Sequence, residues 1–371
     1  MKMKILHVIN SLRTGGAEKL LVDLVVWLRE KDIRVEVAVL NGEETPLLER
    51  LREECIKVYI LSEGKRAEYS PLHVFRLRSL LDSYDIVHVH LFPAQYWGAL
   101  ASVLSSRHPV MVTTEHSTYN TRCKYRLASW IDKMVYARYD AVICISRAVV
   151  QMMRKKVRGV KLCQVDNGIR TQVFKMRREA DKKALGLGDD VFLLLQVARF
   201  QEEKDQDSVI RALGFLPKNI HVAFAGEGER LESCKQLALE EGVMDRTHFL
   251  GVRNDIPALW ALADVGVMSS HWEGFGLAAV EGMASGKPVV VSRVEGLADV
   301  VGDKRLQFTP SNPRDLADKI LSLYSDADLM EELAQYCLER SSRYDISAMA
   351  EGYLSLYTNL LKERYEGERQ D

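Results

Sequence analysis

The sequence predicts two doubly wound α/β units in series, each built on a mostly parallel sheet. Short apolar runs typical of buried strands alternate with amphipathic runs typical of helices, which is the pattern of repeated βα units. The alternation is interrupted once, by a polar and weakly periodic stretch at residues 169–181 that follows the Asn167-Gly168 turn. A chain of 371 residues is also long enough for two units of ordinary domain size.

In the first half, strands and helices are expected to alternate up to residue 157. The apolar runs predict strands at residues 4–9, 35–40, 58–61, 85–91, 110–114 and 141–146. The runs with one apolar face predict helices at residues 15–30, 46–54, 71–83, 93–105, 125–139 and 148–157. In the first of these helices Leu20, Leu21, Leu24 and Leu28 recur at helical spacing on one side.

The same rhythm restarts after residue 190 and ends in three helices. Strands are expected at residues 191–197, 220–225, 247–250, 264–269 and 289–291. Helices are expected at residues 204–213, 229–241, 256–263, 277–284, 313–324, 327–340 and 346–364. The run Val289, Val290 and Val291 is apolar at every position, as expected for a parallel strand that is covered on both faces.

Composition and charge narrow the class of protein. The chain is 47% hydrophobic and 28% charged, as in ordinary globular proteins. It has no run of about 18 apolar residues that could span a membrane, and its first segment is too short and strand-like for a signal peptide. The six cysteines lack CxxC or metal-site spacing, so we expect free buried thiols in a reducing cytoplasm.

Charge is divided unevenly along the chain. The first 175 residues carry 28 Lys and Arg against 18 Asp and Glu, whereas the remainder carries 23 against 34. A basic first half could face anionic lipid or a phosphorylated partner, and the alternative is that the charge is simply scattered unevenly. A basic, aromatic segment at residues 121–138 could touch a membrane surface, or it could be a domain helix that buries its apolar face.

Five groups of polar or glycine residues directly follow predicted strands. In doubly wound sheets ligands bind beyond the carboxyl ends of the strands, so we expect these groups to line one cleft between the two units. The groups are Gly15 with Gly16, Glu115 with His116, Arg199 with Lys204, Gly226 with Gly228, and Glu273.

The stretch at residues 264–292 is predicted to form a strand, a loop, a short helix and a second strand. Gly274 and Gly276 would let backbone N–H groups approach a ligand closely, and the start of a helix favours an anion. Glu273 and Glu281 bracket this helix start, with Glu281 roughly 7–8 Å along the axis. We interpret the stretch as a pocket that holds a phosphate on the backbone and hydroxyl groups on the two carboxylates.

The cations and glycines each have a structural alternative. Arg199 and Lys204 suit a diphosphate, because arginine can bind it with two hydrogen bonds and lysine acts as a point charge; the alternative is two solvated loop cations. Gly15 and Gly16 could admit a phosphate or sugar at a helix start, or serve only a turn. Gly226 could lie against a phosphate or a base, or it could serve only a tight turn into a helix.

The histidines and acidic pairs are less specific. His116 could contact a bound sugar or stabilise developing charge, and the alternative is a structural histidine. His88 and His90 alternate within an apolar strand, which favours packing or local hydrogen bonding. The two DxD patterns, at residues 205–207 and 326–328, both fall at predicted helix starts, where acids are favoured, so we expect no metal there.

Taken together, these residues resemble the retaining glycosyltransferases of the GT-B fold, specifically glycosyltransferase family 4. The resemblance spans nearly the whole chain. Its most specific part is the E-x7-E motif, which runs from Glu273 through Gly274, Phe275, Gly276 and Leu277 to Glu281. One departure is Arg170, which follows Asn-Gly-Ile where the family often has an acid.

The resemblance implies roles for residues of the second half. Arg199 and Lys204 would hold the donor diphosphate, and Glu281 would bind the nucleotide ribose. Glu273 would bond hydroxyl groups of the donor sugar. Backbone groups of Phe275, Gly276 and Leu277 would meet phosphate and sugar, and the turn of Gly251, Val252 and Arg253 would lie near the base.

The resemblance also implies two Rossmann-like domains facing a cleft. Residues 1–170 would form the acceptor-side domain, with the last helix at 346–371 packing back on it, and residues 171–345 would bind the donor. In the first domain Gly15, Gly16 and His116 would lie near the donor phosphate or sugar. No cofactor or metal is expected, since the nucleotide-sugar is a substrate.

The predicted activity is transfer of a hexose from a nucleotide-sugar, with UDP favoured, to a glycan hydroxyl with retention of the anomeric configuration. The expected acceptor is a lipid-diphosphate-linked glycan of bacterial surface polysaccharide, such as O-antigen or capsule. The enzyme would be cytoplasmic and could bind the inner face of the plasma membrane, with no nucleic-acid partner. Two alternatives stay open: a GT-B sugar-nucleotide epimerase or hydrolase, and a non-catalytic nucleotide-binding scaffold.

Overall fold

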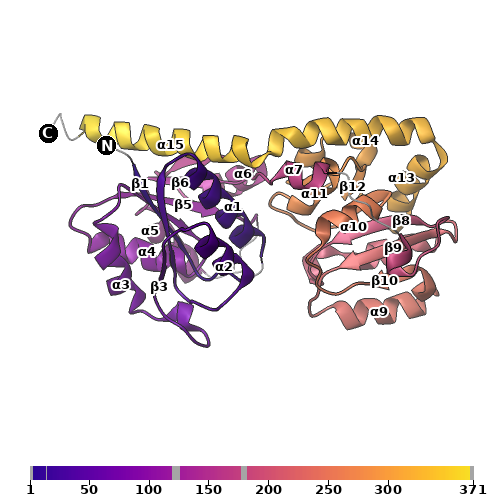
Figure 1. The fold of residues 1–371 in the computed structure, drawn as a ribbon, viewed down its shortest axis with the longest axis horizontal. Coiled ribbons are helices and arrows are strands. Elements are labelled where there is room, and N and C mark those ends of the chain that lie inside the picture. Colours follow the sequence, from indigo (N-terminus) through magenta and orange to yellow (C-terminus); the bar gives the residue numbers. More distant parts are fainter. Residues whose placement is uncertain (1–2, 14, 119–125, 177–181, 368–371) are drawn as a thin grey trace. The chain divides into compact units, whose positions relative to one another are not determined.

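The chain folds into two compact units, which Figure 1 shows in a computed structural model. The structure describes residues 3–13, 15–118, 126–176 and 182–367. The first unit contains Met1–Gly168 and Ile346–Asp371, and the second unit contains Ile169–Asp345. The two boundary segments of the second unit pair with each other, since the Ile169 N–H donates to the Tyr344 carbonyl at 2.8 Å.

The first unit is built on a seven-stranded parallel sheet with the strand order β3-β2-β1-β4-β5-β6-β7. The strands are β1 Lys4–Ile9, β2 Arg34–Val39, β3 Val58–Ile60, β4 Ile86–His90, β5 Val110–Glu115, β6 Ala141–Cys144 and β7 Lys161–Gln164. The order changes direction between β1 and β4, so these two strands form the topological switch point of a doubly wound sheet.

Helices cover both faces of this first sheet. They are α1 Gly16–Glu30, α2 Pro46–Glu53, α3 His73–Leu81, α4 Ala94–Val103, α5 Arg126–Tyr136, α6 Arg147–Lys156 and α15 Ile346–Gly367. Leu6 and Val8 of β1 belong to a core cluster that contains Leu77 of α3 and Ala99 of α4. The alternate residue His7 points to the other face, where α1 and α15 pack against each other.

The second unit has a six-stranded parallel sheet with the order β10-β9-β8-β11-β12-β13. The strands are β8 Phe192–Val197, β9 Ile220–Ala225, β10 Thr247–Phe249, β11 Val265–Met268, β12 Val289–Ser292 and β13 Gln307–Phe308. In chain order this is 3-2-1-4-5-6, the arrangement of dinucleotide-binding sheets, and its switch point lies between β8 and β11.

The helices of the second unit surround this sheet. They are α7 Thr171–Lys175, α8 Gln206–Leu213, α9 Leu231–Glu240, α10 Ile256–Leu262, α11 Leu277–Ala284, α12 Leu297–Val301, α13 Pro313–Ser325 and α14 Ala327–Ser341. The caps follow from the sequence: Asn312 accepts a hydrogen bond from the Asp315 N–H at the start of α13, and Asp326 caps α14 in the same way.

The expectation of mostly parallel sheets is confirmed, and four short strands and α-helices were missed. β7 is half-exposed at the edge of its sheet and lacks an apolar pattern. β13 has two residues, and α7 and α12 have five each, so none of them is long enough to give a periodic signal. Within the described residues, no helix combines the length and the apolar character needed to cross a membrane.

Candidate active site

The site candidates of the second unit gather at the switch point between β8 and β11. Lys204 closes the loop that follows β8, and Glu273 lies in the loop that follows β11. The backbone ties the two loops together, since the His271 N–H donates to the Glu203 carbonyl at 2.9 Å. The strand order therefore places both predicted site residues where a doubly wound sheet binds its ligand.

Lys204 and Glu273 form an ion pair across this switch point. Each side chain is 17% exposed, so the pair is mostly shielded from water yet still reachable. The sequence predicted these two residues as neighbours in a donor site but did not predict that they contact each other. The Glu273 carboxylate thus pairs with the Lys204 ammonium group that was expected to bind a diphosphate.

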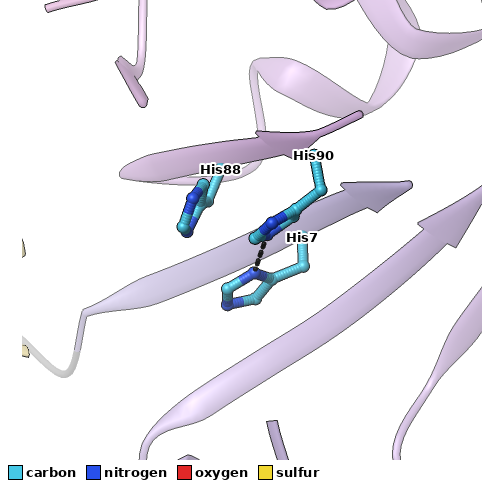
Figure 2. A group of neighbouring side chains, drawn as sticks. All are labelled: His7, His88 and His90. Carbon is cyan, nitrogen blue, oxygen red and sulfur yellow. Dashed lines mark hydrogen bonds between the residues drawn. The ribbon is translucent and has the colours of Figure 1, made fainter. Parts of the chain in front are cut away.

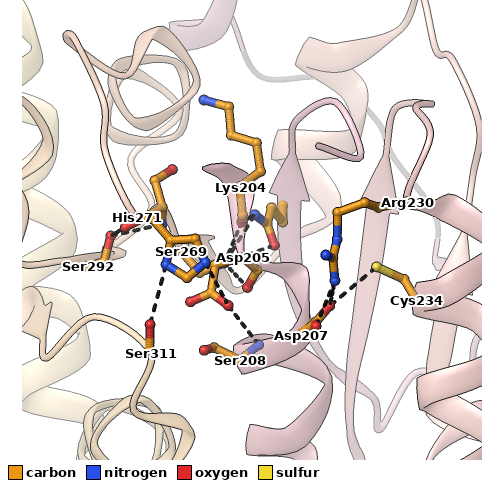
Figure 3. Close-up of polar contacts among 12 residues, drawn as sticks. Lys204, Asp205, Asp207, Ser208, Arg230, Cys234, Ser269, His271, Ser292 and Ser311 are labelled. Carbon is orange, nitrogen blue, oxygen red and sulfur yellow. Dashed lines mark hydrogen bonds and ion pairs between the residues drawn. The ribbon is translucent and has the colours of Figure 1, made fainter. Parts of the chain in front are cut away.

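Buried polar residues that the sequence analysis missed fix the backbone around Lys204. The Ser269 hydroxyl donates toward the carbonyl oxygens of Lys204 at 3.0 Å and Asp205 at 2.9 Å, and Figure 3 shows these three residues together. The side chain of Gln196 donates to the same Lys204 carbonyl at 3.1 Å. A glutamine inside the apolar strand β8 was the available signal, because a buried polar side chain needs a partner.

Arg199 lies in the same loop and its side chain is exposed. Its carbonyl oxygen accepts a hydrogen bond from the buried Gln206 side chain at 3.0 Å, so the backbone is held while the side chain reaches outward. In the part of the chain that the structure describes, no ion pair is recorded for the Arg199 guanidinium. It is thus a cation at the switch point whose charge is available to an anionic ligand.

The acids of the first DxD pattern have structural partners. Asp205 is buried in a left-handed conformation with φ 44° and caps α8 by accepting from the Ser208 N–H. Asp207 pairs with Arg230 at 2.7 Å, as Figure 3 shows. The interpretation of this pattern as helix N-terminal acids is confirmed.

Gly226 and Gly228 let the loop after β9 lie directly on the loop after β8. Both have positive φ, 146° and 158°. A Cβ atom on Gly226 would lie 2.1 Å from the Ala198 carbonyl oxygen, and one on Gly228 would lie 2.2 Å from that of Phe200. The Gly226 N–H also donates to the Gly251 carbonyl at 2.8 Å. These glycines are therefore required by backbone packing, whether or not a ligand also uses them.

Two glycines with positive φ shape the loop from Glu273 to Gly276. Gly276, with φ 91°, ends the loop at the start of α11, and a Cβ there would lie 2.3 Å from Leu297. Gly296, also at φ 91°, packs on the Glu273 carbonyl, where a Cβ would lie 2.4 Å away. The Phe275 side chain is buried against Tyr344, with ring centroids 5.3 Å apart. Only the backbone of Phe275 is thus placed to meet a ligand.

Glu281 lies on the fifth residue of α11, and Leu277 is the first, as the spacing predicted. The Glu281 side chain is buried with 7% exposure. Gly274 lies between Glu273 and this helix, and the Glu273 side chain also accepts from the Gly274 N–H at 3.3 Å. The E-x7-E motif therefore sets one carboxylate in the loop and the other inside the helix.

The turn after β10 carries the predicted base contacts. Gly251 has φ 65°, and the Val252 side chain is 59% exposed. Arg253 binds Asp255 with two hydrogen bonds, at 2.8 and 2.6 Å. Hydrogen bonding to Asp255 raises the pKa of Arg253, and the same contact lowers the pKa of the Asp255 carboxyl. The guanidinium is therefore engaged by its own turn.

The predicted residues Gly15, Gly16 and His116 belong to the first unit. Gly15 precedes α1 in an extended conformation, and Gly16 is the first helical residue. His116 follows β5, and its Nε2 atom is buried without a hydrogen-bond partner among the described residues. Burial lowers the pKa of His116 to about 4, so its imidazole is neutral near pH 7. The role of these three residues in donor binding stays a prediction.

The cysteines described by the structure are free. Burial raises the pKa of Cys144, Cys234 and Cys337 to about 12, which leaves them as neutral thiols. Cys123 lies outside the described residues. The expectation of free thiols is confirmed for the five described cysteines, but the expectation that they are buried is wrong for Cys55, which is exposed, and Cys163 is only partly buried.

Comparison with known proteins gives one family for both halves. Residues 14–173 match the family model described as Glycosyltransferase Family 4, and residues 177–340 match the one described as Glycosyl transferases group 1. The glycosyltransferase MJ1607 of Methanocaldococcus jannaschii, whose printed name calls it uncharacterized, is 30% identical over 267 residues. That match covers 65% of this chain and 67% of the relative.

A second relative has a named substrate, and a solved structure shares the fold. The UDP-Gal:alpha-D-GlcNAc-diphosphoundecaprenol alpha-1,3-galactosyltransferase of Escherichia coli is 27% identical over 231 residues, which cover 58% of this chain and 59% of that enzyme. Anabaena Alr3699/HepE, solved in complex with UDP, superposes with a TM-score of 0.84 at 23% identity, covering 96% of this chain and 100% of that one. The chain therefore belongs to glycosyltransferase family 4, the glycosyl transferases of group 1, and each half adopts the parallel α/β architecture of a GT-B enzyme.

Proposed function

We propose that this glycosyltransferase moves a sugar from a UDP-sugar to a hydroxyl group of a lipid-diphosphate-linked glycan and retains the anomeric configuration. The observation that carries the proposal is the contact of Lys204 and Glu273 at the switch point of the second sheet. A nucleoside diphosphate needs cations and a sugar needs hydrogen-bond acceptors, and this pair supplies one of each. The exposed Arg199 in the same loop supplies a second cation.

The ion pair suggests how donor binding proceeds. The donor diphosphate replaces the Glu273 carboxylate as the partner of Lys204, because it carries more negative charge. Glu273 is then released to accept hydrogen bonds from hydroxyl groups of the sugar, and Glu281 binds the ribose. The diphosphate and the sugar of the donor are thus both needed to separate Lys204 from Glu273 without leaving either charge unpaired.

In the transfer step, the bond between the anomeric carbon and the diphosphate oxygen breaks, and the nucleoside diphosphate leaves with the electron pair. The acceptor hydroxyl attacks from the face that the leaving group vacates and gives its proton to the departing phosphate. Arg199 and Lys204 stabilise the negative charge that grows on the diphosphate. A double displacement would need two carboxylates about 5–5.5 Å apart around the anomeric carbon, and here Glu281 is assigned to ribose.

We assign the acceptor to the first unit and infer that it is presented at a membrane surface. Trp130, Ile131 and Met134 of α5 are 60%, 36% and 50% exposed, next to the exposed Lys133. The alternative of a helix that buries these three side chains is wrong; the side chain of Leu127, expected on the same face, is not described. The Escherichia coli relative is named for a diphosphoundecaprenol-linked acceptor, which supports a lipid-linked acceptor here. We propose that this acceptor belongs to surface polysaccharide synthesis at the inner face of the plasma membrane.

The test is product analysis with and without acceptor. The full chain is incubated with a panel of UDP- and GDP-sugars, and products are followed by mass spectrometry with a polyprenyl-diphosphate-linked sugar present or absent. We expect nucleoside diphosphate and extended acceptor to appear together, and only with acceptor. Complete consumption of donor without acceptor would instead identify an epimerase or hydrolase. Absence of donor binding by calorimetry would identify a scaffold.

A further inference from the structure

The core of the first unit contains three histidines that meet on one face of its sheet, as Figure 2 shows. His88 and His90 alternate along β4, so both point to the same side. His7 of β1 is paired in register with His88. The ring centroids lie 4.0 Å apart for His88 and His90, 5.0 Å for His7 and His88, and 5.3 Å for His7 and His90.

The three rings are removed from water and uncharged. His7 and His88 are 0% exposed and His90 is 3% exposed. Burial lowers the pKa of His7 to about 3 and that of His88 and His90 well below the usual range. A neutral imidazole keeps one ring nitrogen with a free lone pair, which is the form that binds a metal ion.

Internal hydrogen bonds do not satisfy all six ring nitrogens. His7 Nδ1 and His90 Nε2 share one bond of 3.0 Å. His88 bonds Tyr357 through Nδ1 at 2.5 Å and Thr114 through Nε2 at 2.7 Å. His7 Nε2 and His90 Nδ1 are buried with no partner among the residues that the structure describes. These two nitrogens are not the ones that face each other, so in a site formed by His7 Nδ1 and His90 Nε2 they would carry the ring protons.

We propose that His7, His88 and His90 bind one divalent transition-metal ion of the class that prefers imidazole, such as zinc. One nitrogen of each ring lies within 4.8 Å of the others. In a tetrahedral site with zinc–nitrogen bonds of about 2.0–2.1 Å, two ligand nitrogens lie about 3.3 Å apart. The 3.0 Å between His7 Nδ1 and His90 Nε2 is close to that separation, so these two rings need only a small shift, whereas the His88 nitrogen, within 4.8 Å of them, must move closer.

Binding exchanges one set of contacts for another. The hydrogen bond shared by His7 and His90 opens, and both nitrogens turn their lone pairs to the ion. His88 gives up one of its two hydrogen bonds and keeps the other, so Tyr357 or Thr114 orients the ring as outer-shell partners do in known metal sites. Three protein ligands leave the fourth tetrahedral position for a water molecule.

The site would have a structural role. β1 and β4 form the switch point at the centre of the first sheet, and Tyr357 belongs to α15, the last helix of the chain. An ion at this position fixes the two strands to each other and supports the contact with the returning helix. Because the ligands are fully buried, the ion would enter as the unit folds, and binding would add to folding stability. The site is separate from the donor residues, which belong to the second unit.

The second unit provides a matched control. His221 of β9 and His248 of β10 also lie on neighbouring strands, and their Nδ1 and Nε2 atoms are also 3.0 Å apart. Among the described residues, no third histidine has a ring nitrogen within 4.8 Å of both members of this pair. Two imidazoles without a third ligand make a weak metal site, so the pair separates the effect of a histidine contact from that of a three-ligand site.

The test uses the full chain without a polyhistidine tag, produced in medium supplemented with cobalt, which replaces zinc and absorbs visible light. The wild type, the double variant His7→Asn with His90→Gln, and the control variant His221→Asn with His248→Gln are compared. The substitutions preserve the hydrogen-bonding positions of Nδ1 and Nε2 but remove the imidazole ligands. Metal content and the absorption bands of four-coordinate cobalt are measured, together with thermal unfolding before and after chelation.

We expect about one cobalt ion per chain in the wild type and the control variant, and background content in the His7 and His90 variant. Chelation should lower the unfolding temperature of the wild type and leave the His7 and His90 variant unchanged. Equal metal content in all three proteins, or a wild type without the cobalt bands, would overturn the proposal. If the double variant does not fold, the wild-type spectrum decides alone: bands support the site, and their absence refutes it.

Discussion

The packing of Gly226 predicts that a single methyl group will disturb the proposed donor site. A Cβ atom at this residue would lie 2.1 Å from the Ala198 carbonyl oxygen. The backbone of Gly226 also has φ 146°, a conformation that residues with a side chain rarely adopt. The obstacle is backbone, so it cannot rotate away. In Gly226→Ala the loop that carries Arg199 must therefore move, or the loop after β9 must change conformation.

The magnitude follows from two contributions and a control. Backbone strain in a region that favours glycine costs about 1–3 kcal/mol, and forcing an extra methyl group into a packed contact costs a further 1–3 kcal/mol or so. We therefore expect Gly226→Ala to lower the stability of the second unit by about 3 kcal/mol or more. Gly242 of the same unit has φ 65° and nothing within 4 Å of a Cβ, so Gly242→Ala should cost only about 1 kcal/mol.

The assay is thermal unfolding of both variants, followed by UDP titration. For a unit of this size 1 kcal/mol shifts the midpoint by about 2–4 °C, which gives about 6–12 °C for Gly226→Ala and about 2–4 °C for Gly242→Ala. UDP should bind more weakly to Gly226→Ala and normally to Gly242→Ala. The reasoning is refuted if the two variants unfold at the same temperature and bind UDP equally well.

Three further predictions concern separate parts of the molecule. Lys204→Met and Glu273→Gln should each lower the free energy of unfolding by about 1–3 kcal/mol, because each leaves a mostly shielded charge unpaired. The double variant should lose less than the sum of the two single losses. Additive losses in chemical denaturation would contradict the contact. Hydrogen bonds, chiefly that from Ser105, lower the pKa of Asp82 to about 2. The stability that the ionised Asp82 adds to the fold is therefore present above about pH 4 and lost as the pH falls through about 2. The stability of Asp82→Asn should fall less steeply with acid than that of the wild type, and an unchanged pH profile would contradict this. Trp130→Ser should reduce flotation with anionic liposomes, whereas Met176→Ser, at a side chain that is 65% exposed in the second unit, should not; equal recovery of both would count against the membrane surface.

The repeated elements of the fold could be predicted because their signals are local. The helix α11 follows from a run of helix formers that ends at Ser285-Gly286. The strand β12 follows from the unbroken apolar run of valines. Parallel sheets follow from the alternation of strands and helices. The edge strands β7 and β13 could not be predicted, because they are held by pairing with a neighbour and not by a pattern of their own.

The candidate site was predictable in its residues but not in its contacts. Strand-end positions identified Lys204 and Glu273, since the carboxyl edge of a parallel sheet collects such groups. Their ion pair depends on the paths of two loops that are 69 residues apart, and no local signal encodes it. The packing role of Gly226 is also a property of the fold, because its contact is with the backbone of another loop.

The histidine cluster shows the same limit. The strand pattern predicts packing or local hydrogen bonding for His88 and His90, and the hydrogen bonds are confirmed, but only their own strand contributes to that pattern. Their third neighbour, His7, lies about 80 positions away and joins them through the parallel pairing of β1 with β4. A sequence pattern that spans two non-adjacent strands becomes visible only when the strand order is known.

The most direct test of the donor site is the rate of nucleotide release in Arg199→Ala, measured with an active donor and acceptor pair. Arg211 is the control, since it is an exposed arginine of the same unit that pairs with Glu241 at the surface. We predict that Arg199→Ala lowers turnover by about 10²–10³-fold, the cost of removing one group that stabilises developing charge, while Arg211→Ala keeps wild-type turnover. Wild-type turnover in Arg199→Ala would contradict the assignment of this loop to the donor diphosphate.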